Sequence, residues 1–367
     1  MSTFTGIVHE FPDIRIDYFC DLVQRPALAC FLSHVHSDHL KGLQTLKSPF
    51  VYCSPATREI LLRLEKIPSR LNYAQGVTEK RNPTYKDLEK IVKPLPLETP
   101  VVLELKPGLK IQVTLLDANH CVGAVMFLIE GDGNAVLYTG DIRSEPWWVN
   151  AIARSPCMVE YSSGLKHLDR IYLDTSILDD YHLQTKAEGL RELLVKVAQY
   201  PKDTIFHFQA WTYGYEEVWI ALAKALQSKI HVDDYKMRIY KSLVSVIKPT
   251  DDRFPILTPL TREAPYLVGF ARGNSYQDGC LTRDEDARIH SCEKGTSCSV
   301  MENIEHKPVV WIRPIVAHLQ EGQYVAEVGI GGGGDDLMDK PPLQDISAED
   351  IEHLIKMWVY HPRVKVS

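Results

Sequence analysis

The sequence lacks several features that define membrane, secreted or nucleotide-binding proteins. No apolar run in its 367 residues reaches the length of about 20 residues that a membrane-spanning helix needs. Residues 1–30 hold three aspartates and no apolar signal-peptide core, so we expect no secretory signal. The eight cysteines are too few for a disulfide scaffold and are expected to be reduced thiols. The Gly-rich stretch 329–336 is not followed by Lys-Ser or Lys-Thr, so it is no phosphate-binding P-loop.

Positive charge is also scarce. The formal net charge is −7 at pH 7, and no basic run of the kind used for nuclear import is visible. This balance argues against non-specific binding to nucleic acid. It excludes neither a local basic groove nor a metal site, because a metal ion brings its own positive charge. With 45% hydrophobic residues, the chain can bury the core of one large domain or of two ordinary ones.

The hydrophobic pattern changes along the chain. Alternating and continuous apolar runs predict strands or strand pairs over 14–19, 27–34, 110–120, 124–141 and 170–176. After about residue 177, apolar residues at helical spacing (186–200, 213–228) alternate with short strands (204–208, 229–232), which predicts an α/β insert or second domain. The remaining expectations are an exposed connection over 82–100, irregular structure over 250–306, a strand over 308–316 and a final helix over 347–358.

The segment SHVHSDHL (33–40) concentrates groups that bind metals, directly after an apolar strand. His34 and His36 are two residues apart and point the same way if the chain stays extended. A polar loop with chance histidines would account for a lone pair, but not for the full H-x-H-x-D-H spacing. His120 and Asp141 end two further predicted strands. Since imidazoles and carboxylates are ligands of Zn²⁺, we predict a metal site at one edge of a sheet.

Six segments together resemble the metallo-β-lactamase superfamily, and more narrowly the DNA cross-link repair nucleases of its β-CASP branch, the Artemis-like group. They are IDYF, FLSHVHSDHLKGL, VYCSPAT, LLDANHCVGAVMFL, VLYTGDIR and YLDTS. The match is dense over 14–176 and looser to about 318. The resemblance implies an α/β fold, an αββα metallo-β-lactamase sandwich with an inserted α/β β-CASP domain. Residues 1–176 would form the first part of the sandwich, 177–306 the insert and 307–367 the return, whose completeness is open.

The resemblance also implies roles for the residues in these motifs. The implied ligands are His34, His36, His120 and Asp141 for a first Zn²⁺, and Asp38 and His39, with Asp141 as a bridge, for a second. Asp17 would support the site. Asp174 would orient a ligand or a water molecule, the alternative being a strand-end cap. Zinc would activate a water molecule for attack on a phosphodiester, with Asp38 or Asp141 accepting the proton.

A further set of donors lies in the predicted insert. His231 is on a strand, and His290, Cys292 and Cys298 lie in RIHSCEKGTSC (288–298). Two histidines and two cysteines suit a closed structural zinc site. Artemis-like proteins resemble this chain in using a strand histidine and an H-x-C pair, although Cys298 follows Cys292 more closely than in the family pattern. The alternative is a reduced, exposed thiol loop.

The stretch QAWTYGYEE (209–217) raises the question of substrate binding. Free amides at its helix start could bind a phosphate, and Trp211, Tyr213 or Tyr215 could stack on a base. The alternative is ordinary aromatic core. Exonuclease members of the family tend to carry Lys where Tyr215 stands, so the resemblance favours an Artemis-like endonuclease while leaving 5′-exonuclease activity open.

One family feature has no counterpart here. Relatives carry a late histidine within an H-S-S stretch that completes the second zinc shell, whereas His318, His353 and His361 all stand in other contexts. Either the chain is cut short, or the second metal is weakly held or absent.

The predicted function is that of a zinc-dependent DNA nuclease in the repair of interstrand cross-links or double-strand breaks. It would act as a 5′-exonuclease, a structure-specific endonuclease or both, on single-stranded, hairpin or cross-linked DNA. The alternatives are an RNA-processing β-CASP nuclease and a catalytically weak DNA-binding or scaffold member without the second metal. We expect a nuclear monomer that does not associate with membranes.

Overall fold

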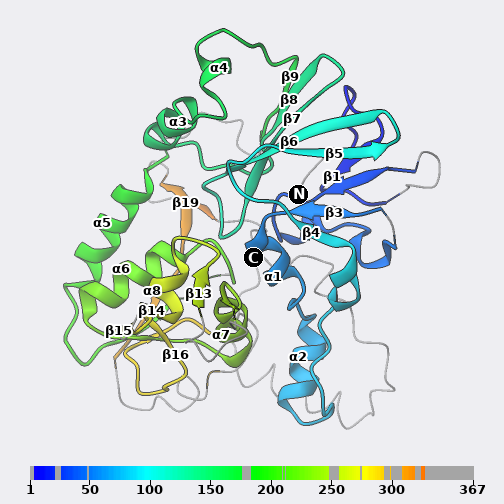
Figure 1. The fold of residues 1–367 in the computed structure, drawn as a ribbon. Coiled ribbons are helices and arrows are strands. Elements are labelled where there is room, and N and C mark those ends of the chain that lie inside the picture. Colours follow the sequence, from blue (N-terminus) through cyan, green and yellow to red (C-terminus); the bar gives the residue numbers. More distant parts are fainter. Residues whose placement is uncertain are drawn as a thin grey trace.

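The computed structural model describes residues 4–20, 26–47, 49–175, 183–208, 210, 212–247, 256–272, 275–292, 298, 308–318 and 324–326. Two stacked sheets lie in the upper right of Figure 1, and a third sheet with its helices lies in the lower left. No helix within these ranges combines the length and apolar character needed to cross a membrane.

The first sheet is parallel and short-stranded. Its strands, in spatial order, are β1 (Ile14–Ile16), β2 (Ala29–Phe31), β3 (Val51–Cys53) and β4 (Val92–Pro94). All three residues of β1 and of β2 are buried, as expected for a sheet covered on both faces. Residues 82–100 are therefore not simply an exposed connection. They contribute η3 (Lys86–Lys90) and β4, with Tyr85, Leu88 and Val92 in the core.

The second sheet is mostly antiparallel. Its strands are β5 (Val101–Lys106), β6 (Leu109–Asp117), β7 (Val125–Gly131) and β8 (Asn134–Tyr138), and β9 (Arg170–Tyr172) adds to β8 in parallel. The predicted hairpin over 124–141 is confirmed. Asp132 and Gly133, both at positive φ, make its turn.

The two sheets pack face to face in an αββα sandwich. Ile14, Ile16 and Phe31 of the first sheet share one core with Phe127 and Val136 of the second. The outer face of the first sheet packs on α1 (Pro55–Leu61). The outer face of the second packs on α3 (Pro146–Ala153) and the segment that leads into α4 (Val159–Ser162).

A third, parallel sheet is built from later residues. Its strand order is β16 (Leu281–Thr282), β11 (Ile230–His231), β17 (Ile289–His290), β10 (Ile205–Phe208) and β18 (Val309–Ile312). The helices of this part are α5 (Lys186–Val197), α6 (Glu216–Leu226), α7 (Asp234–Lys241) and α8 (Ala264–Val268). The predicted alternation of helices and strands is thus present, as the α/β insert of the sandwich.

The remaining elements are short. They are η1 (Ser37–His39), η2 (Leu43–Thr45), α2 (Ile67–Ala74) and the strand pairs β12 (Val244–Ile247) with β13 (Ile256–Pro259), β14 (Phe270–Arg272) with β15 (Ser275–Gln277), and β19 (Ile315–His318) with β20 (Tyr324–Ala326). The expectation of irregular structure over 250–306 is wrong for its described part. The strand expected over 308–316 is divided between β18 and β19, because Arg313 and Pro314 interrupt it. The final helix expected over 347–358 lies outside the described residues.

Candidate metal centre

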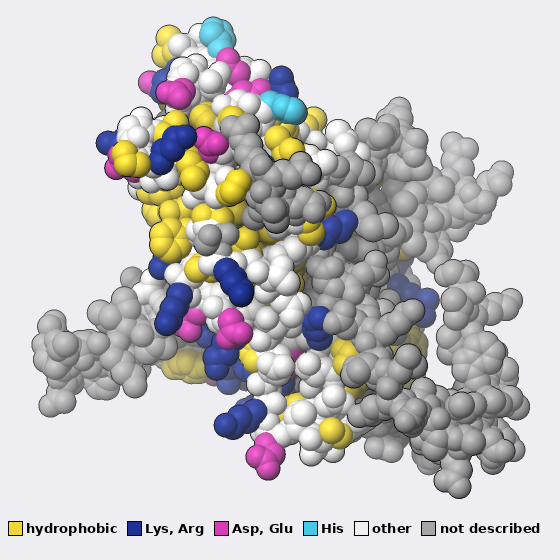
Figure 2. Space-filling model, turned by 90° about the vertical axis from the view of Figure 1, so that its right-hand side faces the viewer, with side chains coloured by type: hydrophobic (Ala, Val, Ile, Leu, Met, Phe, Trp, Pro, Cys, Tyr) yellow, Lys and Arg dark blue, Asp and Glu magenta, His cyan; other side chains and the backbone are white. Residues whose placement is uncertain are grey.

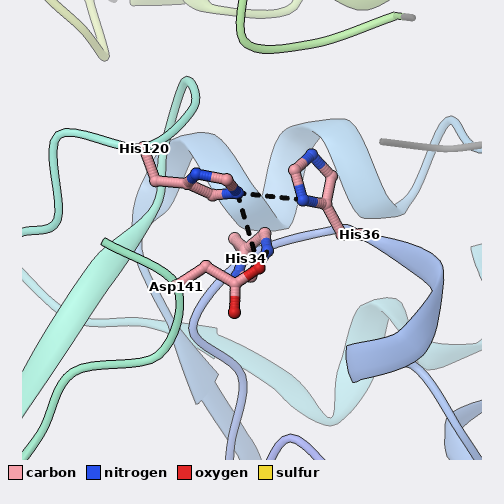
Figure 3. A group of neighbouring side chains, drawn as sticks. All are labelled: His34, His36, His120 and Asp141. Atoms are coloured by element: carbon pink, nitrogen blue, oxygen red, sulfur yellow. Dashed lines mark hydrogen bonds and ion pairs between the residues drawn. The ribbon is translucent and has the colours of Figure 1, made fainter. Parts of the chain in front are cut away.

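The residues predicted to bind a first metal lie on three loops that leave the two stacked sheets. His34 and His36 follow β2, His120 lies between β6 and β7, and Asp141 follows β8. One donor atom from each of the four side chains lies within 4.8 Å of the others. Figure 3 shows the rings of His36 and His120 and the Asp141 carboxylate turned toward a common centre. We call these four residues the cleft cluster.

The spacing of the donor atoms fits a bound cation. His120 Nε2 is 3.1 Å from His36 Nδ1 and 3.6 Å from Asp141 Oδ2. His34 Nε2 is also 3.6 Å from Asp141 Oδ2. The Nε2 atom of His34, which faces Asp141, is buried without a hydrogen-bond partner, which costs free energy unless a ligand satisfies it. Because imidazole nitrogens with a carboxylate are a donor set of Zn²⁺, the cleft cluster is able to hold such an ion.

The protonation states of these side chains also suit metal binding. Burial, reinforced by the His34 and His120 rings, lowers the pKa of His36 well below its ordinary value. Burial and the His34 ring lower the pKa of His120 to about 3. Burial alone would raise the pKa of Asp141, but its contacts with His34 and His39 outweigh this and lower that pKa far below the ordinary range. At neutral pH, His36 and His120 are neutral and Asp141 is anionic, the forms that ligate metals.

The residues predicted for a second metal adjoin the cleft cluster. His39 Nε2 lies 3.2 Å from Asp141 Oδ1 and 3.8 Å from Asp38 Oδ2. Burial opposes a charged ring, but the carboxylates of Asp17 and Asp141 outweigh it and raise the pKa of His39 well above its ordinary value. A metal bound through His39 Nε2 would have to displace this proton, so its binding would weaken as the pH falls.

Asp17 is not part of the cleft cluster, but its hydrogen bonds hold residues next to the metal-binding histidines in place. Its buried carboxylate accepts hydrogen bonds from the Ser33 amide (2.7 Å), the Ser33 hydroxyl (2.6 Å) and the Tyr138 hydroxyl (3.0 Å). His39 Nδ1 lies 2.9 Å from the same carboxylate. Since the Ser33 hydroxyl gives its one hydrogen to Asp17, His34 Nδ1, 2.9 Å away, donates to Ser33 Oγ and leaves Nε2 as the ligand atom. Sequence reasoning missed Ser33 and Tyr138, although Ser33 directly precedes the H-x-H pair.

Two contacts fix the loop that carries Asp141. Gly140 has φ +54°, and a Cβ at this position would lie 2.9 Å from Ser33 Oγ, so only glycine fits here. Asp174 accepts a hydrogen bond from the Ile142 amide at 3.2 Å. Asp174 thus holds the backbone next to Asp141. This contact is compatible with both roles considered for Asp174, the orientation of a ligand or a water molecule and the capping of a strand end.

The start of α1 fixes the loop that carries His120. The hydroxyls of Ser54 and Thr57 donate to the Gly123 carbonyl at 2.7 and 2.8 Å. Gly123 has φ +84°, and a Cβ there would lie 2.9 Å from the Thr57 amide nitrogen. The motif VYCSPAT therefore positions the loop of His120.

The cleft cluster forms part of the wall of a cleft of about 2480 Å³ between the sandwich and the elements from α5 onward. Asp38, His39, His120 and Asp141 line the cleft on the sandwich side, and residues of α5, α6 and β18 line it opposite them. On the side of the molecule drawn in Figure 2, hydrophobic side chains gather in the upper half and Lys and Arg side chains lie mainly below them.

Tyr213 and Tyr215, two of the aromatic residues predicted to bind substrate, are buried. Tyr213 has 0% of its surface exposed, and Tyr215 packs edge-on against Phe208 with ring centroids 5.3 Å apart. The Gly214 amide donates to the carboxylate of Glu216 at 3.1 Å, so it is not open to a phosphate. The aromatic-core alternative therefore describes Tyr213 in this structure, and Trp211 lies outside the described residues.

The sulfur-containing set assembles on the third sheet. His231 and His290 are in register on β11 and β17, and their Nδ1 atoms are 3.1 Å apart. Cys292 Sγ lies 3.4 Å from His231 Nδ1, and Cys298 Sγ lies 3.6 Å from His290 Nδ1. All four side chains are buried, contrary to the exposed thiol loop considered as the alternative. We call these residues the sheet cluster. Donor atoms of His231, His290 and Cys298 lie within 4.8 Å of one another, so this cluster too could hold a metal ion.

Comparisons with known proteins agree with this architecture. The family model of the anti-Pycsar protein Apyc1 matches residues 22–161. Protein artemis of Gallus gallus is 34% identical over 323 residues, which cover 82% of this chain and 40% of the relative. Protein artemis of Homo sapiens is 34% identical over 269 residues, covering 67% and 35%. The 5′ exonuclease Apollo of Gallus gallus is 32% identical over 219 residues, covering 59% and 40%.

The αββα sandwich, the parallel sheet inserted into it and the H-x-H-x-D-H motif at the cleft define a β-CASP metallo-β-lactamase protein. Within this class, the chain belongs to the family of Artemis and Apollo. It spans 35 to 40% of the length of the three curated relatives.

Proposed function

We propose that this chain is a zinc-dependent DNA nuclease that hydrolyses phosphodiester bonds in the repair of interstrand cross-links or double-strand breaks. The observation that carries the proposal is the cleft cluster, which shares Asp141 with the adjoining pair Asp38 and His39 on the wall of a wide cleft. The family relationship to proteins named artemis and 5′ exonuclease Apollo supports a nucleic-acid substrate.

The residues of the cleft divide the work of hydrolysis. Bound at the cleft cluster, Zn²⁺ would supply activation of a water molecule and stabilisation of negative charge on the phosphate. Ser33 keeps the ring of His34 in the tautomer that presents Nε2. Asp141 is a poor proton acceptor because its contacts with His34 and His39 hold its pKa far below the ordinary range. We therefore assign the role of general base to Asp38, which also lines the cleft.

The sheet cluster is proposed to hold a structural Zn²⁺. Donor atoms of His231, His290 and Cys298 lie within 4.8 Å of one another, and Cys292 Sγ lies 3.4 Å from His231 Nδ1. Two imidazoles with two thiols are a donor set of closed structural zinc sites, which leave no position for substrate. A hydrogen bond to Cys298 and burial raise the pKa of the Cys292 thiol, so metal binding there releases a proton.

The finer properties of the enzyme follow the family relationship. We propose action on single-stranded, hairpin or cross-linked DNA in the nucleus, by a monomer. Tyr215 stands where exonuclease members tend to carry Lys, which favours endonuclease cleavage with 5′-exonuclease activity as a second mode.

The experiment is cleavage of 5′- and 3′-labelled single-stranded and hairpin DNA by the purified chain, beside RNA of the same sequence. Protein from which a chelator has removed the metal is the negative control. Re-addition of Zn²⁺ should restore its activity. Metal-dependent cleavage of DNA supports the proposal, and product lengths separate exonuclease from endonuclease action. Preferential cleavage of RNA would favour the RNA-processing alternative. No cleavage by protein with metal in the cleft cluster would favour the scaffold alternative.

A further inference from the structure

The loops that carry His120 and Asp141 are bonded directly to each other. Asn119, next to His120, has φ 53° and donates from Nδ2 to the Arg143 carbonyl at 2.9 Å. The Arg143 amide in turn donates to the Ala118 carbonyl at 3.2 Å. These two bonds fix the separation of the two loops. They therefore also fix the separation of His120 and Asp141, the metal-binding residues on these loops.

The first residue of α5 joins both loops to the insert. Lys186 Nζ donates to Asn119 Oδ1 at 3.0 Å, and the Lys186 amide donates to Glu145 Oε1 at 2.8 Å. Glu145 Oε1 also accepts a hydrogen bond from Arg143 Nε at 2.8 Å. Asn119, Arg143, Glu145 and Lys186 therefore close a ring of hydrogen bonds, which we call the loop clamp.

The loop clamp is built for rigidity. Asn119 and Glu145 are only 4% and 5% exposed, and bonds between charged groups and buried polar groups are stronger than neutral ones. The ammonium of Lys186 can only donate, so it selects the oxygen end of the Asn119 amide and turns the NH₂ end toward the Arg143 carbonyl. Without this ammonium, the amide of Asn119 loses one of the two contacts that set its orientation, and its buried Oδ1 loses its donor.

We propose that Lys186 is a positioning residue for the catalytic metal, acting through Asn119 on the spacing between His120 and Asp141. The inference rests on the proposed function and extends it. The insert, through the first turn of α5, then contributes to the metal site as well as to the opposite wall of the cleft. The competing role is direct contact with a substrate phosphate, because the side chain of Lys186 is 25% exposed and lines the same cleft.

The test compares Lys186→Met, Lys186→Arg and a matched control, Thr185→Ala. Thr185 caps the same helix through a capping box with Glu188 but takes no part in the loop clamp. Affinity for Co²⁺ is measured without DNA, by competition with a chelator. The part of the Co²⁺ absorption signal that is lost in His36→Ala is assigned to the cleft cluster. Thermal midpoints and the separate values of kcat and KM for DNA cleavage are measured on the same proteins.

The expected result is a loss of metal affinity of about 10- to 100-fold in Lys186→Met, the usual effect of removing a residue that orients a metal ligand. Lys186→Arg restores much of it, and Thr185→Ala leaves it near that of the native chain. Unchanged metal affinity with a raised KM would overturn the proposal in favour of direct phosphate contact. An equal loss in Thr185→Ala would overturn it in favour of general weakening of α5. If the native chain and His36→Ala bind the same amount of Co²⁺, the proposed function itself fails, and this inference fails with it.

Discussion

The cleft cluster and the sheet cluster share a principle of construction and differ in chemistry. Both draw histidines from the ends of strands or from loops that follow them. The cleft cluster uses nitrogen and oxygen donors, and part of the Asp141 side chain remains exposed to the cleft. The sheet cluster uses nitrogen and sulfur donors and is buried throughout. An open site leaves room for substrate, whereas a closed site contributes only to folding.

The surroundings of the two clusters strengthen this contrast. Charged groups surround the cleft cluster, including Asp17, Asp38 and the clamp residue Lys186. Around the sheet cluster, Ser291 is held by four hydrogen bonds. Its amide donates to the His231 carbonyl at 2.8 Å, and its hydroxyl accepts from Trp219 Nε1 and donates to the Phe208 carbonyl, both at 3.1 Å. Its carbonyl accepts from Lys236 Nζ at 3.0 Å. Under the proposed function, polar groups in the cleft orient the metal ligands, while those near the sheet cluster hold a turn of the fold.

The largest expected effect concerns the proposed general base. Asp38→Asn should lower kcat for DNA cleavage by about 10²- to 10⁴-fold, the usual contribution of a positioned base. The thermal midpoint and the metal content of the sheet cluster should not change. Steady-state kinetics with metal analysis on the same sample checks this, and Asp87→Asn on η3 serves as a control distant in sequence. If Asp38→Asn kept its activity, Asp38 would not be the general base and Asp141 would take that role.

A substitution in the sheet cluster should lower stability, in contrast to the loss of activity expected for Asp38→Asn. Cys292→Ser should lower the free energy of unfolding by about 3 kcal/mol or more, because loss of a structural metal is among the most destabilising changes. Denaturant unfolding with and without added Zn²⁺ measures this change. Cys157→Ser, at a free thiol that belongs to neither cluster, is the matched control. Equal stability of the two variants would mean that the sheet cluster holds no structural metal.

A smaller effect is expected at Ser33. Ser33→Ala removes the hydroxyl that joins Asp17 to His34 and should lower metal affinity at the cleft cluster by about 10- to 100-fold. Chelator competition measures the change. Ser162→Ala, on α4, provides a comparison at a serine whose hydroxyl bonds only to nearby backbone carbonyls. Native affinity in Ser33→Ala would show that the tautomer of His34 does not depend on this contact.

The smallest expected effect is on the pH dependence of stability. In metal-free protein, the carboxylates of Asp17 and Asp141 raise the pKa of His39 well above the value of 6.5 expected for an unfolded chain. The His39 contribution to stability is therefore complete below pH 6.5 and is lost as the pH rises through the folded-state pKa. Metal binding requires the neutral ring, so stabilisation by added Zn²⁺ should grow over the same range. Thermal midpoints against pH, with chelator and with Zn²⁺, test this, and His39→Gln should remove the first trend.

Much of the site could be predicted from the sequence, because its residues follow apolar runs that form strands. His34, His36, His120 and Asp141 are of this kind, and so is His231. The supporting contacts could not be predicted in the same way. Ser33 meets Asp17 through the pairing of β1 with β2, and Tyr138 meets it only after the two sheets have stacked, and no local pattern records these long-range contacts.

The missed elements have a similar explanation. β4 is a strand of only three residues within a charged, Pro-rich stretch, too short to show a period of two. Its place in the sheet comes from pairing with β3 and from the buried side chain of Val92. Likewise β16 and β17 have two residues each, and tertiary pairing within the third sheet defines them.

The most direct test of the account measures cleavage and bound metal together in the native chain, His36→Ala and Cys292→Ser. The account predicts that His36→Ala loses DNA cleavage and the metal of the cleft cluster, while it keeps its fold and the metal of the sheet cluster. Cys292→Ser should lose the other metal and its stability, while the molecules that remain folded still cleave DNA. Cleavage by His36→Ala at the native rate would contradict the central claim that the cleft cluster holds the catalytic metal.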